Sequence, residues 1–571
     1  MASPSSASLN PGSPASTHHP GMTSVNTKNI VILLILALSL ALIVIDSTVV
    51  NITLPAIQAD FSVSVNDLEW ISSIYALFFG SFILTWGKLG DQFGRRRIFM
   101  GGVTLFIVGS AIDGLSANLS MMLLGRAIQG FGSAMASPST LSILTTTFTG
   151  RARSVAFGVW GAVAGASGAL GPLLGGYFTT YDSWRWAFLI NVPIGLVALI
   201  GALIVIKESK FKTPNYTTDY GGVTLITLSL SALIFGLIEG QTYGWLAEKQ
   251  TFTALGFIWP FSNFSLPAFS IVSGTLLLLL FIYYEIKRQH AGKDPLFEFS
   301  LLKFTGFRFG ILTVLIVAVG EFGVFFILSL YLQIVRGLSA IETGITFLPM
   351  AITLLISAPL AGLLASRVGP KWIVTTGMTL EGIALLAMSQ VITISFPIYY
   401  LYPVLIVYGA GVGLAVGQLT NTVLTSIPWQ KAGIGSGANN TVRQIGAAFG
   451  VAIIGAVLVA VMSSGGQADL NASAVIPDAL KASIAKVFDS GLTGGIGFSM
   501  PFGVAGTPVG DAIKTVFNDA ITQGTRSAAL TAGIFCGGGA VCSLLIPNAK
   551  KADGSKSSEF DQHQPASEAT A

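Results

Sequence analysis

The sequence GKLGDQFGRRRIFM, residues 87–100, is the most informative part of this chain about its fold. An apolar run ends just before it, near Trp86, and another begins at Ile98. The short connection between them carries one acid, Asp91, and four basic residues. Its glycines allow a tight backbone turn. Two hydrophobic helices joined by a short basic loop indicate a membrane hairpin whose loop lies in the cytoplasm.

The composition places most of the chain in a membrane. Of 571 residues, 52% are hydrophobic and only 10% are charged, whereas a soluble domain carries about 25% charged residues. The net charge of +4 is small and the basic residues are spread among loops, so nucleic acid is not an expected partner. No P-loop, GxSxG, HExxH or CxxC motif is present, so we expect no enzyme, no cofactor and no metal ion.

Fourteen apolar runs are each long enough for the roughly 20 residues that a bilayer crossing needs. They lie at about residues 30–51, 68–86, 98–114, 119–143, 154–178, 186–206, 221–241, 268–286, 309–332, 340–365, 372–391, 399–425, 436–463 and 526–546. With both ends inside, the inner loops and tails hold 21 of the 30 lysines and arginines, as the positive-inside rule requires. We therefore expect a multi-pass protein of the cell membrane with both termini in the cytoplasm.

An internal repeat divides the chain into two halves. Residues 362–371, GLLASRVGPK, form a weakened copy of GKLGDQFGRR at residues 87–96, with Ser366 in place of Asp91. The original lies between the second and third runs and the copy between the tenth and eleventh. Two six-helix halves separated by two extra helices explain this offset. The predicted regions are a disordered tail 1–28, a first half 29–206, two additional spans and linkers 207–304, a second half 305–548 and a tail 549–571.

A long segment, residues 464–525, separates the last two apolar runs. Two of its pieces, IPDALKASIAKVF and VGDAIKTVFNDAI, have helix-like apolar spacing. We expect an outer loop with short amphipathic helices that lie at the membrane surface.

Several motifs resemble those of the major facilitator superfamily. The pattern G-x-L-x-D-x-x-G-R-R-R is similar to the signature between that family's second and third helices. Residues 167–176, SGALGPLLGG, resemble its antiporter motif, with Ser167 in place of the first glycine. Residues 183–195, SWRWAFLINVPIG, resemble the opening of the sixth span in fourteen-helix drug:proton antiporters of the EmrB/QacA type. The resemblance implies an all-α fold of two six-helix bundles plus two extra helices, in a monomer.

The basic loop contains the candidate residues of a conformational latch. Gly87, Asp91, Gly94, Arg95 and Arg96 are expected to hold the cytoplasmic side closed in one state. Asp91 can do so by facing a helix amino terminus across the interface of the two halves. A cluster that only sets the orientation of the chain is the alternative, although it explains the arginines and not the acid or the glycines.

The fifth span carries a candidate bending segment. Gly171, Gly175 and Gly176 give a smooth face for close helix packing, and Pro172 removes one backbone hydrogen bond and allows a bend. Ordinary packing of small residues explains the same composition. Only the resemblance implies export.

Ionisable residues inside apolar runs are costly in lipid, so each is a candidate for function. Asp46 lies five residues before the outer end of the first run, and Arg126 lies about seven residues into the fourth. At 1.5 Å per residue, both lie roughly 8–10 Å below the outer surface. We expect them to pair or to share a proton, and so to couple proton movement to transport; a static ion pair is the alternative.

Glu321 lies near the middle of the ninth run. It is expected to bind a cationic substrate or a second proton, or to be structural.

Four other ionisable residues receive lesser roles. Glu381 lies on a supporting helix and is interpreted as structural, whereas Asp113 and Glu239 lie near the ends of runs, within reach of water. Arg443 is about 10 Å from the inner face and is expected to extend toward it.

These observations predict a proton-coupled antiporter that exports small amphipathic compounds such as drugs or antibiotics by alternating access. Its partners would be the substrate, protons and the lipid bilayer. An uptake symporter, and a membrane receptor or scaffold that moves no substrate, are the alternatives. The identity of the substrate and the proton stoichiometry are not encoded in any motif.

Overall fold

The computed structural model describes residues 27–63, 65–209, 219–254, 257–261, 263–490 and 507–548. The predicted disordered tail at 1–28 and the tail at 549–571 lie almost entirely outside the described residues. Residues 491–506 of the predicted outer loop also lie outside them.

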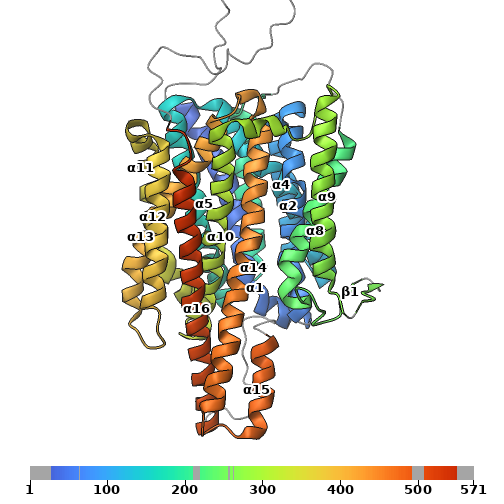
Figure 1. Ribbon diagram of the computed structural model, residues 1–571. Helices are drawn as coiled ribbons and strands as arrows, with labels where there is room; N and C mark the ends of the chain where they lie inside the picture. Colours follow the sequence, from blue (N-terminus) through green and yellow to red (C-terminus); the bar gives the residue numbers. More distant parts are fainter. Residues whose placement is uncertain are drawn as a thin grey trace, which may run out of the picture.

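The first half of the chain forms long helices that run side by side (Figure 1). Their apolar side chains suit a lipid environment, where a helix satisfies its backbone hydrogen bonds internally. The elements are α1 (Thr27–Phe61), α2 (Val65–Phe93), α3 (Arg95–Gly114), α4 (Leu119–Thr147), α5 (Gly150–Tyr181), α6 (Trp186–Leu189) and α7 (Asn191–Val205).

An extra helix pair follows, α8 and α9, and it packs against α2 and α14 at one side of the bundle. Its connecting segment contains a two-residue antiparallel ladder, which is the only strand pairing among the described residues. The elements are α8 (Tyr220–Tyr243), β1 (Thr253–Ala254), β2 (Phe257–Ile258), α9 (Leu266–His290) and the short 3-10 helix η1 (Phe299–Lys303).

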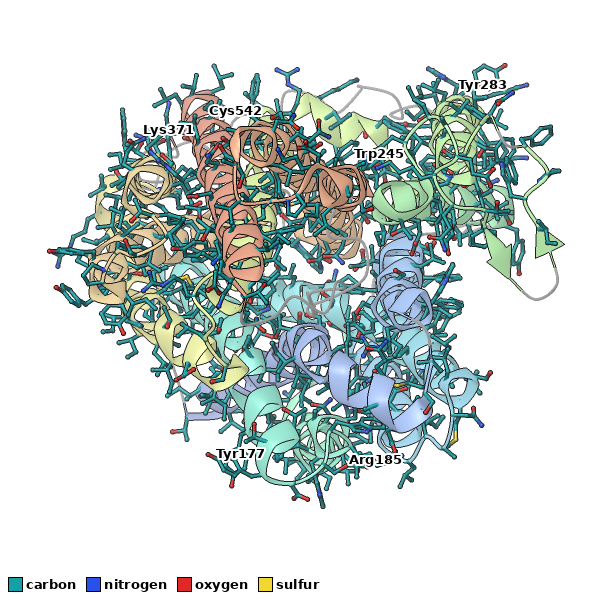
Figure 2. The ribbon with its side chains drawn as sticks, turned by 90° about the horizontal axis from the view of Figure 1, so that it is seen from below. Tyr177, Arg185, Trp245, Tyr283, Lys371 and Cys542 are labelled. Carbon is teal, nitrogen blue, oxygen red and sulfur yellow. The ribbon has the colours of Figure 1, made fainter. Side chains whose placement is uncertain are left out.

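The second half repeats the plan of the first, with a turn near Gly369 between two long helices as there is near Gly94. The elements are α10 (Thr305–Ile334), α11 (Ala340–Val368), α12 (Pro370–Val391), η2 (Ile398–Tyr400), α13 (Leu401–Thr425), η3 (Trp429–Lys431), α14 (Ala432–Ala472), α15 (Asp478–Ser490) and α16 (Pro508–Ser543). Seen along the helices, Tyr177 and Arg185 of the first half lie opposite Lys371 and Cys542 of the second (Figure 2). Trp245 and Tyr283 mark the extra helix pair at a third corner.

The described residues contain eleven helical segments that are long and apolar enough to cross a membrane. Three other long helices, α4, α10 and α16, run in the same bundle. The chain is therefore an all-helical multi-pass membrane protein, as predicted. We call the end of the bundle where α1 begins and α16 ends the terminal face, and the other end the opposite face (Figure 1).

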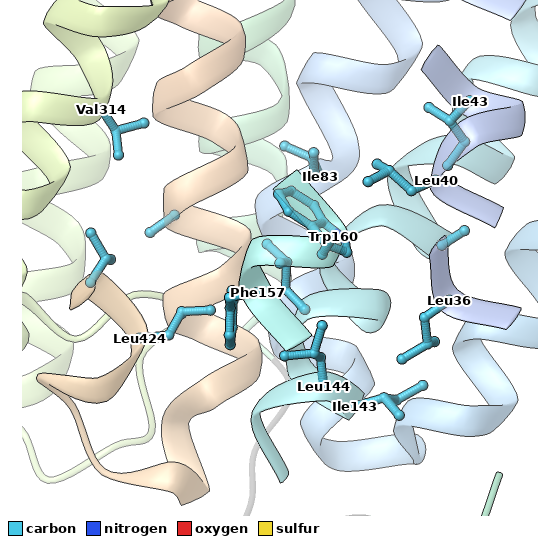
Figure 3. Close-up of a cluster of buried hydrophobic side chains, with 14 of the residues drawn as sticks. Leu36, Leu40, Ile43, Ile83, Ile143, Leu144, Phe157, Trp160, Val314 and Leu424 are labelled. Atoms are coloured by element: carbon cyan, nitrogen blue, oxygen red, sulfur yellow. The ribbon is translucent and has the colours of Figure 1, made fainter. Parts of the chain in front are cut away.

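One apolar core joins the two halves toward the terminal face. One cluster of buried side chains includes Leu36 and Leu144 from the first half together with Val314 and Leu424 from the second (Figure 3). Toward the opposite face the cores separate. The cluster around Val49 contains only residues of the first half, and the cluster around Leu328 is built almost entirely by the second. The halves thus share an apolar core at the terminal face and have their own cores toward the opposite face, where they still touch because α5 packs on α11 at Leu173 and Gly344.

The region predicted as an outer loop with surface-lying helices is different. Helix α14 continues to Ala472, and α16 begins at Pro508, so both extend beyond the bundle at the opposite face (Figure 1). With α15 they form a separate apolar cluster around Leu470, Ile484 and Phe517. The prediction of helices lying on the membrane was wrong because their apolar faces pack against one another instead.

Candidate functional site

Asp91 joins the two halves at the terminal face. Its Oδ1 accepts a hydrogen bond from the backbone N–H of Gly433 at 3.1 Å, and its Oδ2 accepts one from Ile434 at 3.2 Å. These two amides lie in the first turn of α14, where free N–H groups and the helix dipole attract an anion. The Arg95 guanidinium donates to Asp91 Oδ1 at 2.8 and 2.6 Å, and to the Trp429 carbonyl at 3.3 Å. Asp91 and Arg95 are both buried.

The backbones of α2 and α14 approach each other closely beside this contact. A Cβ placed on Gly87 would lie 2.6 Å from the Gly433 carbonyl oxygen and 2.9 Å from the Gly437 Cα. A Cβ on Gly433 would collide with the Asp91 carboxylate. Only glycine permits this approach, which brings Asp91 within reach of the α14 amides.

Arg96 does not belong to this contact, contrary to the predicted latch. Its guanidinium donates to the Leu203 carbonyl at 2.6 Å, and its backbone N–H donates to Glu208 at 3.1 Å. The Glu208 carboxylate therefore accepts hydrogen bonds from the first backbone N–H groups of α3, at Arg96 and Arg97. The N-cap of this helix is Gly94, with φ of 115°. Arg96 tethers the loop to its own half because it follows Arg95 by one residue and points about 100° away around the helix.

The segment between α9 and α10 touches both halves at the terminal face. Lys88 of the first half pairs with Asp294 at 2.9 Å, and Lys431 of the second half pairs with Glu298. We call residues 291–304 the clasp segment. It carries one acid that pairs with each half.

A second polar cluster surrounds Asp46 within the first half. Arg126 donates to Asp46 Oδ2 at 2.5 Å, and the side-chain amides of Gln129 and Asn191 each donate to Oδ1 at 3.0 Å. The Arg126 side chain also donates to the Ile71 carbonyl at 3.1 Å and lies over the ring of Tyr75. Asp46 and Arg126 are 0% and 1% exposed. Residues of four helices, α1, α2, α4 and α7, therefore surround a fully buried ion pair, and almost every polar atom of the pair has a hydrogen-bond partner.

Sequence reasoning missed the amides in this cluster. Gln129 lies three residues after Arg126, on the same face of α4, and it also accepts from Arg126 at 2.6 Å. Asn191 lies within the stretch of residues 183–195 that resembled an antiporter span. The i, i+3 spacing was the available signal for Gln129. Nothing local indicated that Asn191 would reach α1.

The predicted bending segment of α5 packs against the same part of α1. A Cβ on Gly171 would collide with the Thr48 hydroxyl, and one on Gly175 would lie 3.0 Å from Val49. Pro172 lies between them, inside a continuous helix. Gly176 is buried. The smooth face thus contacts α1 of its own half, directly beside Asp46.

A third polar cluster lies in the second half. Arg443 donates to Glu321 at 3.1 Å, and Glu381 is fully buried nearby, where it accepts a weak hydrogen bond from the Cys536 thiol at 3.7 Å. The expectation that Arg443 extends toward the inner face was wrong, because it turns to the acid instead. Glu321, predicted to bind substrate, is almost fully buried against this arginine.

Asp113 and Glu239 are also buried, although their positions near the ends of runs placed them close to water. Asp113 lies against Gly125, next to Arg126. Its burial results from the packing of α3 on α4, which apolar runs alone do not reveal. Among the described residues, no group of three or more His, Cys, Asp or Glu side chains is arranged to hold a metal ion.

The fold and these clusters define a class of protein: a two-halved helical membrane carrier with buried charges within each half and a charged contact between the halves. Residues 36–451 match the Major Facilitator Superfamily. The chain belongs to that family.

Curated relatives match over most of their length. The "Tetracenomycin C resistance and export protein" of Streptomyces glaucescens is 31% identical over 75% of both chains. The "Methylenomycin A resistance protein" of Bacillus subtilis is 32% identical, over 76% of this chain and 89% of that one. The "Multidrug resistance protein Stp" of Mycobacterium tuberculosis is 29% identical over 77% of this chain and 78% of its own.

Solved structures are similar in fold. The human organic anion transporter MFSD10 (TETRAN) aligns with a TM-score of 0.55 at 13% identity, over 92% of this chain and all of that one. The proton:xylose symporter XylE aligns with a TM-score of 0.53 at 12% identity, over 91% and 96% of the two chains. At such low identity the likeness concerns the fold.

Proposed function

We propose that this protein exports small amphipathic compounds across the cell membrane in exchange for protons. The direction of transport rests on the relatives, which are named for resistance to, and export of, antibiotics. The observation that carries the proton coupling is the buried Asp46–Arg126 pair, because a buried ion pair inside a membrane helix bundle is costly and is kept mainly for function. The protein is a carrier, as its family is, and not an enzyme.

Proton exchange would act on the contacts of Asp46. Protonation removes the charge that holds Arg126 and the two amide donors, so it loosens α1 from α4 and α7. Helix α5 lies against α1 through Gly171 and Gly175, and it can bend at Pro172. A change at Asp46 would therefore move the helix that also packs on the second half through α11 and α13.

The contact between Asp91 and α14 would act as the latch of the closed terminal face. It joins the halves through two charge-assisted hydrogen bonds, and the clasp segment adds an ion pair to each half. Gly87, Gly94 and Arg95 shape and support it. The structure thus corresponds to a state closed at the terminal face, where the apolar cores also merge.

We propose fourteen spans, of the EmrB/QacA type, with the terminal face in the cytoplasm. The eleven apolar segments and the three long helices α4, α10 and α16 together provide that number. Helices 29–206 and 305–548 form the two halves, and 207–304 the inserted pair. The excess of lysine and arginine in the loops of the terminal face supports this orientation, and a monomer suffices because each half is complete.

Everted membrane vesicles provide the test. Ethidium, a planar cation, and chloramphenicol, a neutral compound, are added to vesicles that hold a proton gradient, and a pH-sensitive dye reports the gradient. An antiporter dissipates it on addition of a transported compound, whereas a symporter requires the opposite gradient. A receptor or scaffold responds to neither direction. Vesicles with Asp46→Asn are the matched control, since that variant keeps size and hydrogen bonding.

A further inference from the structure

The second half contains two buried acids for one arginine. Glu321 comes from α10, Glu381 from α12 and Arg443 from α14. The two carboxylates interact electrostatically with each other and with the arginine. Glu321 is 4% exposed and Glu381 0%. If both acids were ionised, the cluster would carry a net negative charge inside the bundle, where a charge without a partner is strongly disfavoured.

The hydrogen bonds distinguish the two acids. Glu321 accepts a hydrogen bond from the Arg443 guanidinium at 3.1 Å. Glu381 accepts one only from the thiol of Cys536, which is a weak donor. The Oε1 atoms of both acids and the Tyr408 hydroxyl are buried and have no hydrogen-bond partner among the described residues. The two acids therefore differ in their counter-charge: Glu321 has the arginine, whereas Glu381 has only a weak neutral donor, so burial favours the neutral form of Glu381.

The neighbouring helices supply no second cation. Among the described residues, the titratable groups that act on this pair are Tyr408 of α13, Arg443 of α14 and Cys536 of α16. Helix α11 contributes none. Arg443 is therefore the single positive charge facing two carboxylates.

We propose that Glu381 is a proton-binding site, in which this acid stays protonated while Glu321 is ionised on Arg443. The site is separate from Asp46, which lies in the other half. When Arg443 shifts from Glu321 to Glu381, the proton of Glu381 can pass to Glu321: one O–H bond breaks, one forms, and the negative charge moves to Glu381, beside the arginine. The assignment describes an equilibrium property of the protein and does not depend on the direction of transport.

The first half contains a similar set of charges, although its arginine comes from the fourth helix of the half and the arginine of the second half from the fifth. The internal repeat that relates Gly369 to Gly94 also relates Glu321 to Asp46, and α12 corresponds to α3. Asp113 of α3 is fully buried, interacts with Asp46 and Arg126, and has no hydrogen-bond partner on either oxygen among the described residues. In each half an acid on the first helix takes the arginine, and an acid on the third helix has none.

Infrared spectroscopy of the purified full-length protein in lipid nanodiscs tests the site. A protonated carboxylic acid has a carbonyl stretch that a carboxylate lacks. The spectrum of the wild type minus that of Glu381→Gln, at neutral pH, should contain the absorption of one carboxylic acid per molecule. Acids elsewhere cancel in this difference. Glu342→Gln, at an exposed position where glutamine also fits the capping box, should show no such difference.

The coupling between the two acids gives a second measurement. In Glu321→Gln the arginine loses its partner, so Glu381 should release its proton at lower pH than in the wild type.

The stability of Glu381→Gln is the control. This variant should fold with an unchanged melting temperature, because glutamine is close in shape to a neutral acid. A marked loss of stability would mean that an ionised Glu381 is needed. An unchanged carbonyl absorption in Glu381→Gln, or an unchanged titration in Glu321→Gln, would overturn the proposal.

Discussion

The turn between α2 and α3 and the turn between α11 and α12 have the same backbone but different chemistry. Gly94 has φ of 115° and Gly369, its counterpart in the internal repeat, has φ of 97°. Both values are rarely open to other residues. Asp91, however, is buried against α14, whereas its counterpart Ser366 is exposed and donates to the Leu363 carbonyl of its own helix at 2.7 Å. The repeat thus preserves the turn in both halves and the charge in one.

The glycines before these turns remain equivalent. Gly87 faces Gly433 and Gly437 of α14, and Gly362, its counterpart in the repeat, faces Ser154 and Val155 of α5. Each half therefore presses one glycine against a helix of the other half. Close backbone approach is symmetric across the interface, while the ionic contact is not. The fold therefore requires both turns, whereas only one of them carries the latch.

The largest effect is expected from Asp91→Asn. The change leaves Arg95 buried without its carboxylate, and breaking a buried pair costs about 3–5 kcal/mol. The closed terminal face should then lose more than about 100-fold in population relative to the open one. Export should be abolished at normal membrane levels, as measured by dye efflux and by immunoblot. Ser366→Ala is the matched control and should export normally. Equal loss of export in both variants would contradict the proposal that only the turn with Asp91 carries the latch.

Asp46→Asn should separate binding from coupling. Asparagine keeps the size and a hydrogen-bonding oxygen but cannot titrate, so substrate should still bind while proton-driven export fails. A static ion pair would behave differently, because an unpaired buried Arg126 costs about 3–5 kcal/mol and should reduce the folded protein itself. Binding and efflux are measured on the same purified variant. Intact uphill export would exclude Asp46 from the mechanism.

Gly87→Ala and Gly362→Ala should be similar in effect, and weaker than Asp91→Asn. Each added methyl meets backbone atoms at 2.6–2.7 Å, so the helices must move apart by a fraction of an ångström. Overpacking typically costs about 1–3 kcal/mol, so roughly tenfold slower transport is expected for each. Rates in reconstituted vesicles provide the comparison, with Gly168→Ala as control because its Cβ would meet nothing within 4 Å. A large difference between the two variants would show that closure is asymmetric in packing as well as in charge.

The smallest effect concerns substrate choice at Glu321. If its carboxylate serves as a counter-charge, Glu321→Gln should weaken export of ethidium several-fold and leave export of neutral chloramphenicol nearly unchanged. The effect is modest because the second acid, Glu381, remains to balance the charge of Arg443. Resistance measured for both compounds, with and without the change, decides the matter. Equal loss for both would assign Glu321 to proton exchange or folding.

Much of the fold followed from local patterns. Apolar runs of bilayer length and the basic loop at residues 87–97 predicted a helical membrane protein, and the displaced copy at 362–371 predicted two halves around an inserted pair. The prediction that helices of this outer segment lie on the membrane surface was wrong because hydropathy does not distinguish a helix that lies on a membrane from one that continues out of it. Helices α14 and α16 extend because α15 covers their apolar faces.

Of the candidate sites, the sequence alone indicated that Asp46, Arg126 and Glu321 are buried, and at what depth, but it placed Asp113 and Glu239 too close to water. Asp46 and Arg126 were found because an ionisable residue in an apolar run is rare and its depth follows from the rise per residue. Their partners Gln129 and Asn191, the pairing of Arg443 with Glu321, and the clasp segment became visible only in three dimensions. Asp91 meets an amide 342 residues away, and each residue turns a helix by about 100°. Spacing along the chain fixes depth in the membrane, but the partner depends on how each helix is rotated against its neighbours, which only packing settles.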